Sequence, residues 1–167
     1  MKTVYMDATL KNAPILIFSV KETQVLNAGA TIYSMPVNEK NDEYRRYACE
    51  YDVRFIFDDD IPVVDFYTVP QVDIFAVDSS GGYLGTVGDM TDLRSDLPIC
   101  YINNEHKCFL VANTGKEFLD HVQNWKERLV SFEEVEFFVS REAAKQEYEF
   151  FYIEAAIDDL SRRKHGC

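Results

Sequence analysis

The chain has 167 residues, of which 47% are hydrophobic and 14% aromatic, and this composition excludes a disordered protein. Its formal net charge is −12, from 29 acidic and 17 basic residues, and such a charge argues against binding of DNA or RNA through a basic patch. No stretch approaches the roughly 20 apolar residues of a membrane span, and residues 1–12 lack the apolar core of a signal peptide, so we expect a cytoplasmic protein.

In the first third of the chain, apolar runs rich in β-branched residues predict two strands, residues 14–20 and 30–35. A helix is predicted over residues 38–52, with Asn38 or Asn41 as its N-cap. One face of this helix carries side chains at spacings of three and four: Tyr44, Tyr47, Ala48 and Tyr51.

A buried-strand pattern at residues 53–57 runs into three consecutive aspartates at 58–60. The apolar run that follows, residues 61–70, is bracketed by Pro62 and Pro70. Because proline cannot donate a hydrogen bond to a neighbouring strand, this run is predicted to be an edge strand or an extended crossing.

Two pairs of apolar runs come next, and each pair has the spacing of a hairpin. The first pair is residues 72–77 and 83–87, separated by Asp-Ser-Ser-Gly-Gly. The second pair is residues 98–102 and 107–112, separated by Asn-Asn-Glu-His.

The apolar periodicity then becomes helical. Thr114 and Glu117 form a capping-box pattern, and apolar residues at helical spacing follow as far as Leu129. A second helix is predicted from Ser131, which has a glutamate three residues later, and a third over residues 140–160. The apolar face of the third helix is broad, so it must pack on a sheet or on a partner.

This order of elements indicates the α+β class. We expect a single, largely antiparallel sheet flanked by helices that are concentrated in the C-terminal third. One domain is expected over residues 1–167, in which residues 131–167 form a C-terminal helical extension.

The glycine pair Gly81-Gly82 raises the possibility of a phosphate- or metal-binding loop. A Walker-type loop needs Gly-Lys-Ser/Thr at the start of a helix, a dinucleotide fingerprint needs GxGxxG between strand and helix, and a calcium loop needs alternating Asp/Asn ligands. None of these patterns is present, because Tyr83 and a strand-like run follow the glycines. The segment is therefore predicted to be the turn of a hairpin, with Gly85 leaving room for a bulge.

The carboxylates Asp58, Asp59 and Asp60 concentrate charge in the way a metal site does. Neighbouring side chains on an extended segment point to opposite faces, however, so a solvated turn is the favoured interpretation. Asp89 and Asp92 resemble turn or helix-start residues rather than a catalytic pair.

Histidine and cysteine patterns point to no catalytic, metal-binding or cofactor-binding residue. None of the histidines lies at ligand spacing from another: His106, His121 and His165. Cys108 and His106 are two residues apart, but the flank of a hairpin explains them more simply than catalysis. The four cysteines show no CxxC spacing, so we expect them to be reduced, with Cys49 and Cys100 buried.

The segment 131–160 is strongly acidic, with nine Asp or Glu residues against Arg141 and Lys145. A solvated face on a packed helix explains this composition. An acidic docking surface for a basic protein is the alternative interpretation.

Residues 70–122, PQVDIFAVDSSGGYLGTVGD…LPICYINNEHKCFLVANTGKEFLDHV, resemble the SMI1/KNR4-like, or SUKH, superfamily. The shared pattern is an apolar strand, a Gly-rich turn and a second strand, then a strand with a Pro-Ile/Val-Tyr-like element, and a helix with a Phe-Leu pair, here Phe118-Leu119. The resemblance covers about a third of the chain. It implies an α+β fold with a sheet flanked by helices and implies no catalytic residues. Many bacterial members resemble immunity proteins that neutralise toxins, often nucleases.

The resemblance and the net charge together predict a non-catalytic protein-binding module. In this hypothesis an intracellular immunity protein, monomer or homodimer, neutralises a basic, nuclease-type toxin by stoichiometric binding through an acidic surface. It needs no cofactor, nucleic acid or membrane. The candidate partner-binding residues are Asp58, Asp59, Asp60, Asp78, Asp89 and Asp92.

Two alternatives remain open at this point. One is a structural or regulatory subunit that packs through Tyr148, Phe151 and Tyr152. The other is a metal-dependent enzyme with an acidic pocket that contains the 58–60 aspartates, Asp78 or His106.

Overall fold

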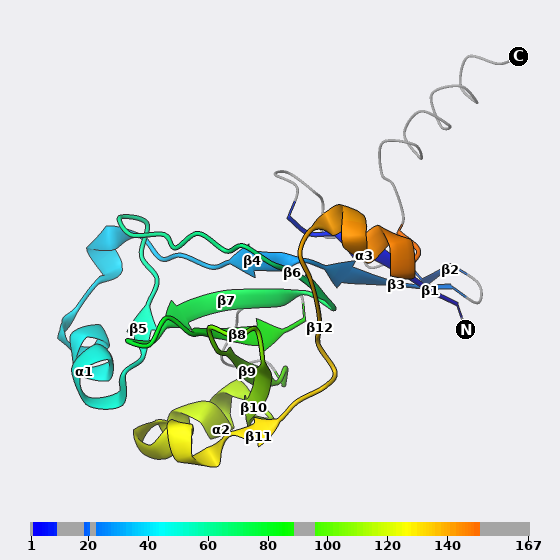
Figure 1. Cartoon of the computed structure of the whole chain (residues 1–167). Helices are drawn as coiled ribbons and strands as arrows, with labels where there is room; N and C mark the ends of the chain where they lie inside the picture. The colour runs from blue at the N-terminus through cyan, green and yellow to red at the C-terminus, as the bar shows by residue number, and fades with distance from the viewer. Residues whose placement is uncertain (1, 10–18, 21–22, 89–95, 151–167) are drawn as a thin grey trace, which may run out of the picture.

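A computed structural model describes residues 2–9, 19–20, 23–88 and 96–150 of the chain (Figure 1). Within these residues the strands are β1 (Lys2–Asp7), β2 (Ser19–Val20), β3 (Thr23–Ala28), β4 (Ala30–Ile32), β5 (Arg54–Phe55), β6 (Tyr67–Val69), β7 (Val72–Val77), β8 (Tyr83–Val87), β9 (Ile99–Ile102), β10 (Cys108–Ala112), β11 (Val130–Ser131) and β12 (Glu136–Phe138). The α-helices are α1 (Asp42–Tyr51), α2 (Gly115–Asp120) and α3 (Arg141–Glu147), and the 3-10 helices are η1 (Val37–Glu39) and η2 (Val122–Arg128).

The main sheet has seven strands in the order β11-β10-β9-β8-β7-β4, with β5 also paired to β7. All of its pairings are antiparallel except that of β4 with β7. The α+β class and the largely antiparallel sheet are therefore confirmed. Both hairpins are confirmed as well, because β7 pairs with β8 and β9 pairs with β10.

Two smaller sheets lie beside the main one, so the expectation of one sheet was too simple. The first has the order β1-β3-β2, with β1 parallel to β3. The second pairs β6 with β12. Strands β1 and β3 were not predicted, because their polar residues mask a period-two pattern of buried side chains such as Val4 and Met6.

The predicted helix at 38–52 is confirmed as α1, with Asn41 as its N-cap. The Asn41 side chain accepts hydrogen bonds from the backbone N–H groups of Glu43 and Tyr44. The predicted strand at 30–35 corresponds to β4, and most of the strand predicted at 14–20 lies outside the described residues.

The helix predicted from Ser131 is wrong. Residues 130–131 form β11 at the edge of the main sheet, and residues 136–138 form β12. The helix predicted over 140–160 begins as expected at the N-cap Ser140 and ends at Glu147, because Tyr148 is extended. Residues beyond Phe150 lie outside the described part.

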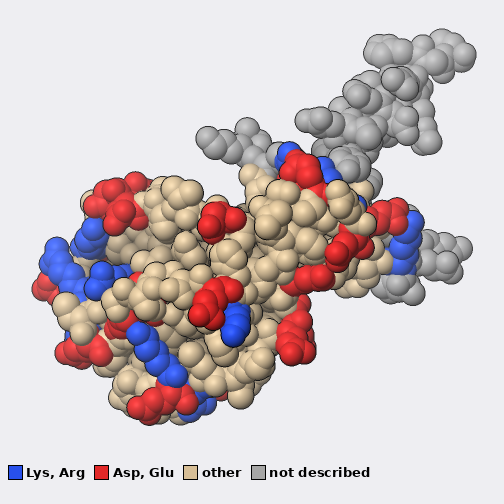
Figure 2. All heavy atoms as spheres, viewed as in Figure 1, with Lys and Arg blue, Asp and Glu red and all other residues tan. Residues whose placement is uncertain are grey.

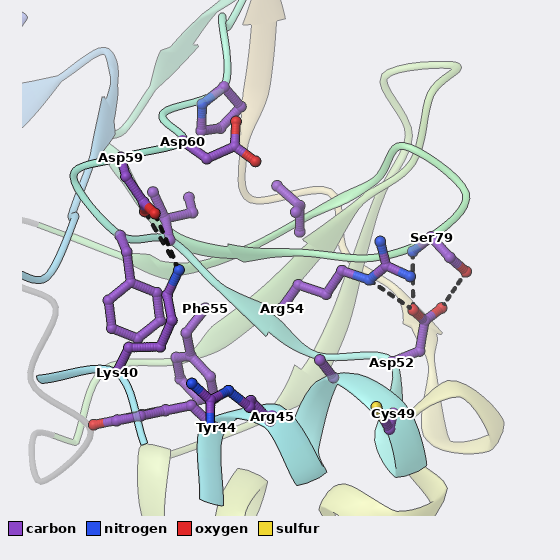
Figure 3. Close-up of a pocket in the computed structure, with 15 residues that line it drawn as sticks. Lys40, Tyr44, Arg45, Cys49, Asp52, Arg54, Phe55, Asp59, Asp60 and Ser79 are labelled. Carbon is purple, nitrogen blue, oxygen red and sulfur yellow. Dashed lines mark hydrogen bonds and ion pairs between the residues drawn. The ribbon is translucent and has the colours of Figure 1, made fainter. Parts of the chain in front are cut away.

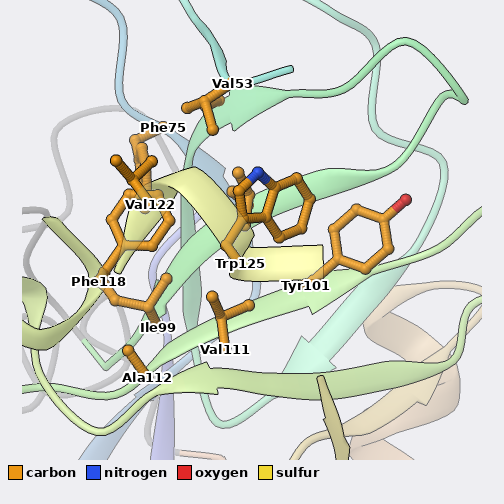
Figure 4. Packing of buried hydrophobic residues seen from close by; sticks show 11 residues of the cluster. Val53, Phe75, Ile99, Tyr101, Val111, Ala112, Phe118, Val122 and Trp125 are labelled. Atoms are coloured by element: carbon orange, nitrogen blue, oxygen red, sulfur yellow. The ribbon is translucent and has the colours of Figure 1, made fainter. Parts of the chain in front are cut away.

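The helices α1, α2 and η2 cover one face of the main sheet (Figures 1 and 4). Phe118 of α2 and Trp125 of η2 are buried there against Ile99 and Tyr101 of β9. The indole N–H of Trp125 also donates to the Tyr51 carbonyl at 2.7 Å, which joins η2 to the end of α1.

The opposite face of the main sheet is covered by extended segments. Cys100 and Ile102, which alternate along β9 with the residues of the helical face, pack there with Phe66 and Val135. Both faces are therefore buried, which explains the continuous apolar runs of the central strands. No helix among the described residues is long and apolar enough to cross a bilayer.

Candidate functional site

The turn between β7 and β8 is organised by the carboxylate of Asp78. This carboxylate accepts hydrogen bonds from the Tyr101 hydroxyl and the Gly82 N–H, each at 2.7 Å, and from the Ser80 hydroxyl at 2.8 Å. Gly81 has a φ of +87°, and a Cβ at Gly82 would overlap the Tyr101 ring. The two glycines therefore serve the geometry of the hairpin, as the sequence predicted.

Lys126 of η2 joins this turn to the end of α1. Its ammonium lies 2.6 Å from Asp52 and 3.5 Å from Asp78. Asp52 adopts a left-handed conformation at the C-cap of α1 and also accepts hydrogen bonds from the N–H and hydroxyl of Ser79. No local sequence pattern indicates this network, because Lys126 and Asp52 are 74 residues apart and only the fold brings them together.

Each ionisable group of the network is held in its ordinary charge state. Burial alone would raise the pKa of Asp78, but the hydrogen bonds from Tyr101, Gly82 and Ser80 outweigh it and lower the pKa. Burial raises the pKa of Tyr101 to about 12. Burial would lower the pKa of Lys126, but Asp52 and Asp78 raise it. No member of this network is poised to exchange a proton near neutral pH, so the arrangement is suited to bracing the fold.

Asp78 was predicted to lie on an acidic rim open to a partner, and its position contradicts that prediction. The residue is only 5% exposed, because the turn folds around its carboxylate. Of the other predicted partner-binding residues, Asp58, Asp59 and Asp60 are exposed. Asp89 and Asp92 lie outside the described residues.

The three exposed aspartates follow the short bridge that Phe57 makes with Met35. Their side chains have different neighbours: Asp58 accepts a hydrogen bond from the Ser34 hydroxyl, and Asp59 lies 3.2 Å from the Lys40 ammonium. The carboxylates are therefore spread over the loop, as expected for a solvated turn.

A groove of about 840 Å³ lies between α1 and this acidic loop, at the edge where β5 joins the main sheet (Figure 3). Its lining includes the aromatic side chains of Tyr44, Phe55 and Phe57. The centroid of the Tyr44 ring lies 5.1 Å from that of Phe55 and 5.5 Å from that of Phe57. Asp59 and Asp60 lie at its rim. The groove is open and amphipathic, which is typical of a contact surface for another molecule.

Charges of both signs surround the groove (Figure 3). Arg54 is 3.9 Å from Asp52, and the Lys40 ammonium lies 5.0 Å from the centroid of the Phe57 ring. Cys49 lines the groove and is exposed, which corrects the expectation that it would be buried, whereas Cys100 is buried as expected. Helix α1 contacts the sheet through its tyrosine face, and Cys49 lies off that face.

The side chains of His106 and Cys108 have different neighbours. The His106 ring lies against Phe66 and Phe137, and its Nε2 is 3.5 Å from Asp65. Cys108 is buried, and its thiol lies in hydrogen-bond contact with the Cys100 thiol. This contact and burial together raise the pKa of Cys100. The raised pKa of Cys100 disfavours its thiolate, which is the nucleophilic form.

Acidic side chains gather over β12 and α3 on the face shown in Figure 2. Several of them have partners: Glu149 lies 2.9 Å from the Lys2 ammonium, and Glu136 accepts a hydrogen bond from the Tyr148 hydroxyl. Glu133 and Glu134 are exposed. Within the described part of the chain, no group of three or more His, Cys, Asp or Glu side chains is placed to hold a metal ion.

The acidic loop and the groove beside it are therefore the best candidate for a functional surface. They combine exposed carboxylates with exposed apolar side chains at Ile61 and Val63, which the sequence analysis did not single out. Comparison with protein-family models, with curated proteins and with solved structures found no match.

Proposed function

We propose that this protein is a non-catalytic binding module for a basic protein, acting through the loop of residues 58–65. Acidic and apolar side chains are exposed together on this loop, and that combination carries the proposal. Large exposed apolar side chains next to charged ones are typical of protein contact surfaces.

The distribution of charge supports a basic partner. Residues 55–93 contain eight aspartates and no Lys, Arg or Glu. Among the described residues of this stretch, the exposed carboxylates are those of Asp58, Asp59, Asp60 and Asp65, and Lys40 lies beside Asp59. Complementary charge accelerates encounter and disfavours acidic competitors.

The most specific form of this proposal is an immunity protein of the SMI1/KNR4-like type in the cytoplasm, which neutralises a basic toxin by occupying its surface. The described residues of the segment 70–122, which carries the resemblance to that superfamily, include β7, β8, β9, β10 and α2.

Co-expression with the product of the adjacent gene tests the proposed function. We expect a 1:1 complex on size-exclusion chromatography and protection of the host cell from that product. Absence of a complex together with persistent toxicity would contradict the proposal.

Paired charge reversals test the surface. The double substitution Asp59→Lys with Asp60→Lys is expected to weaken the complex at least tenfold. Glu133→Lys with Glu134→Lys makes the same change in net charge on two adjacent exposed residues elsewhere and should have a small effect. Equal weakening by both pairs would show that only the overall charge matters.

A further inference from the structure

Residues 61–66 form an extended segment that displays two apolar side chains to solvent. Exposure alternates along it: Ile61 and Val63 are 51% and 88% exposed, whereas Val64 is half-buried and Phe66 is buried. This period of two is that of a strand with one face on the core. Val63 is a β-branched residue whose side chain packs on almost none of the described residues.

The inward side chains hold this segment firmly in place. The Phe66 ring lies 5.7 Å from the Tyr83 ring, 5.1 Å from His106 and 5.6 Å from Phe137, between centroids. The Tyr83 hydroxyl donates to the Val63 carbonyl at 3.4 Å, and Pro62 restricts φ next to it. The exposed valine is therefore presented from an anchored backbone, which reduces the entropy lost when a partner binds.

Carboxylates flank the two apolar side chains. Asp60 precedes Ile61 at the rim of the groove, and the Asp65 side chain, 77% exposed, follows Val63 two residues later. The Asp65 carboxylate lies 3.5 Å from Nε2 of His106. A surface of this kind complements an apolar pocket bordered by Lys or Arg, and it repels one bordered by Asp or Glu.

We propose that Ile61 and Val63 are the apolar anchor of the interface and enter a pocket on a basic protein, with Asp60 and Asp65 pairing with Lys or Arg at the rim of that pocket. This inference rests on the proposed function and names its contact residues. A small anchor that becomes fully desolvated at the centre of an interface dominates the affinity, while charges at the rim mainly set the association rate.

The test compares two valines in the complex with the adjacent gene's product. Val63→Asp is expected to weaken binding at least tenfold. Val139→Asp is the matched control, because Val139 is 86% exposed and receives the same substitution; its dissociation constant should stay within about twofold of wild type. Val63→Ala should raise the dissociation rate, and thermal unfolding of each free variant checks that the fold is intact.

A labelling experiment gives an independent readout. Cys49 is exposed in the groove whose rim carries Asp60, whereas Cys100 and Cys108 are buried. In a Cys167→Ser variant, the partner should slow the reaction of Cys49 with a maleimide. If the complex forms but Val63→Asp binds as tightly as Val139→Asp, the assignment of Val63 as an anchor is wrong, and the proposed function stands. If no complex forms, the proposed function and the proposed anchor are both wrong.

Discussion

At the residue scale, Asp78 is the carboxylate whose surroundings decide its role. Tyr101, Ser80 and the Gly82 N–H replace the water that a surface aspartate would bind, and Lys126 balances its charge. A buried acceptor with these donors stabilises the fold most strongly when it is ionised. Its place in the hairpin is therefore structural.

Asp78→Asn is expected to lower the free energy of unfolding by about 2–3 kcal/mol, because the amide leaves donors unpaired and removes the charge opposite Lys126. Asp60→Asn, at an exposed position, should change it by less than about 0.5 kcal/mol. Urea denaturation at pH 7 measures both. Equal effects would contradict the structural role.

The same variant also tests the pH dependence. The pKa of Asp78 in the folded protein lies below its ordinary value of 3.8, so the stabilisation is present above that value and is lost as the pH falls through the lower folded pKa. The stability difference between wild type and Asp78→Asn should therefore narrow in that acidic range. A difference that stays constant there would contradict the linkage.

At the element scale, α2 shows a local signal that predicted a helix correctly. The Thr114 hydroxyl accepts a hydrogen bond from the Glu117 N–H at 3.1 Å, and the Glu117 carboxylate accepts one from the Asn113 N–H at 3.1 Å. The first bond satisfies an N–H group that the first turn leaves free, and the second ties the residue before the N-cap to that turn, so the helix begins where the sequence indicated.

Thr114→Ala is expected to cost about 1 kcal/mol of stability, because the cap loses its acceptor. Thr114→Ser keeps the hydroxyl and is the matched control. Thermal unfolding of the two variants measures the difference, and equal melting temperatures would show that the cap contributes nothing.

The helix predicted from Ser131 failed although it had a similar signal. Ser131 is followed by Glu134 three residues later, but the open edge of β10 competes for this segment. Residues 130–131 pair with β10, and the Phe132 N–H donates to the Cys108 carbonyl. A capping pattern describes only local hydrogen bonds. An available strand edge offers the same backbone groups a different set of hydrogen-bond partners.

At the scale of the whole molecule, the net charge of −12 attracts basic proteins and repels acidic ones. The charge acts over a distance of about 8 Å at physiological ionic strength and is screened by salt. The attraction to a basic partner must therefore weaken as the ionic strength rises.

We expect the association rate constant with the adjacent gene's product to fall steeply between about 0.05 and 0.5 M salt, while the dissociation rate changes much less. Stopped-flow measurement with the purified proteins gives both rates. An association rate that does not depend on salt would argue against electrostatic steering.

The sequence by itself determined the α+β class, the β7–β8 and β9–β10 hairpins, and the start of α1, α2 and α3, because turn glycines, capping residues and apolar periodicity act over a few neighbouring residues. Only the tertiary structure decided which aspartates reach solvent. Asp78 and Asp60 look alike in the sequence, yet the first is buried by Tyr101 and the second lines an open groove. The exposure of Val63 depends likewise on Phe66, Tyr83 and Phe137 packing beneath it, and contacts between distant segments are not encoded in any local pattern.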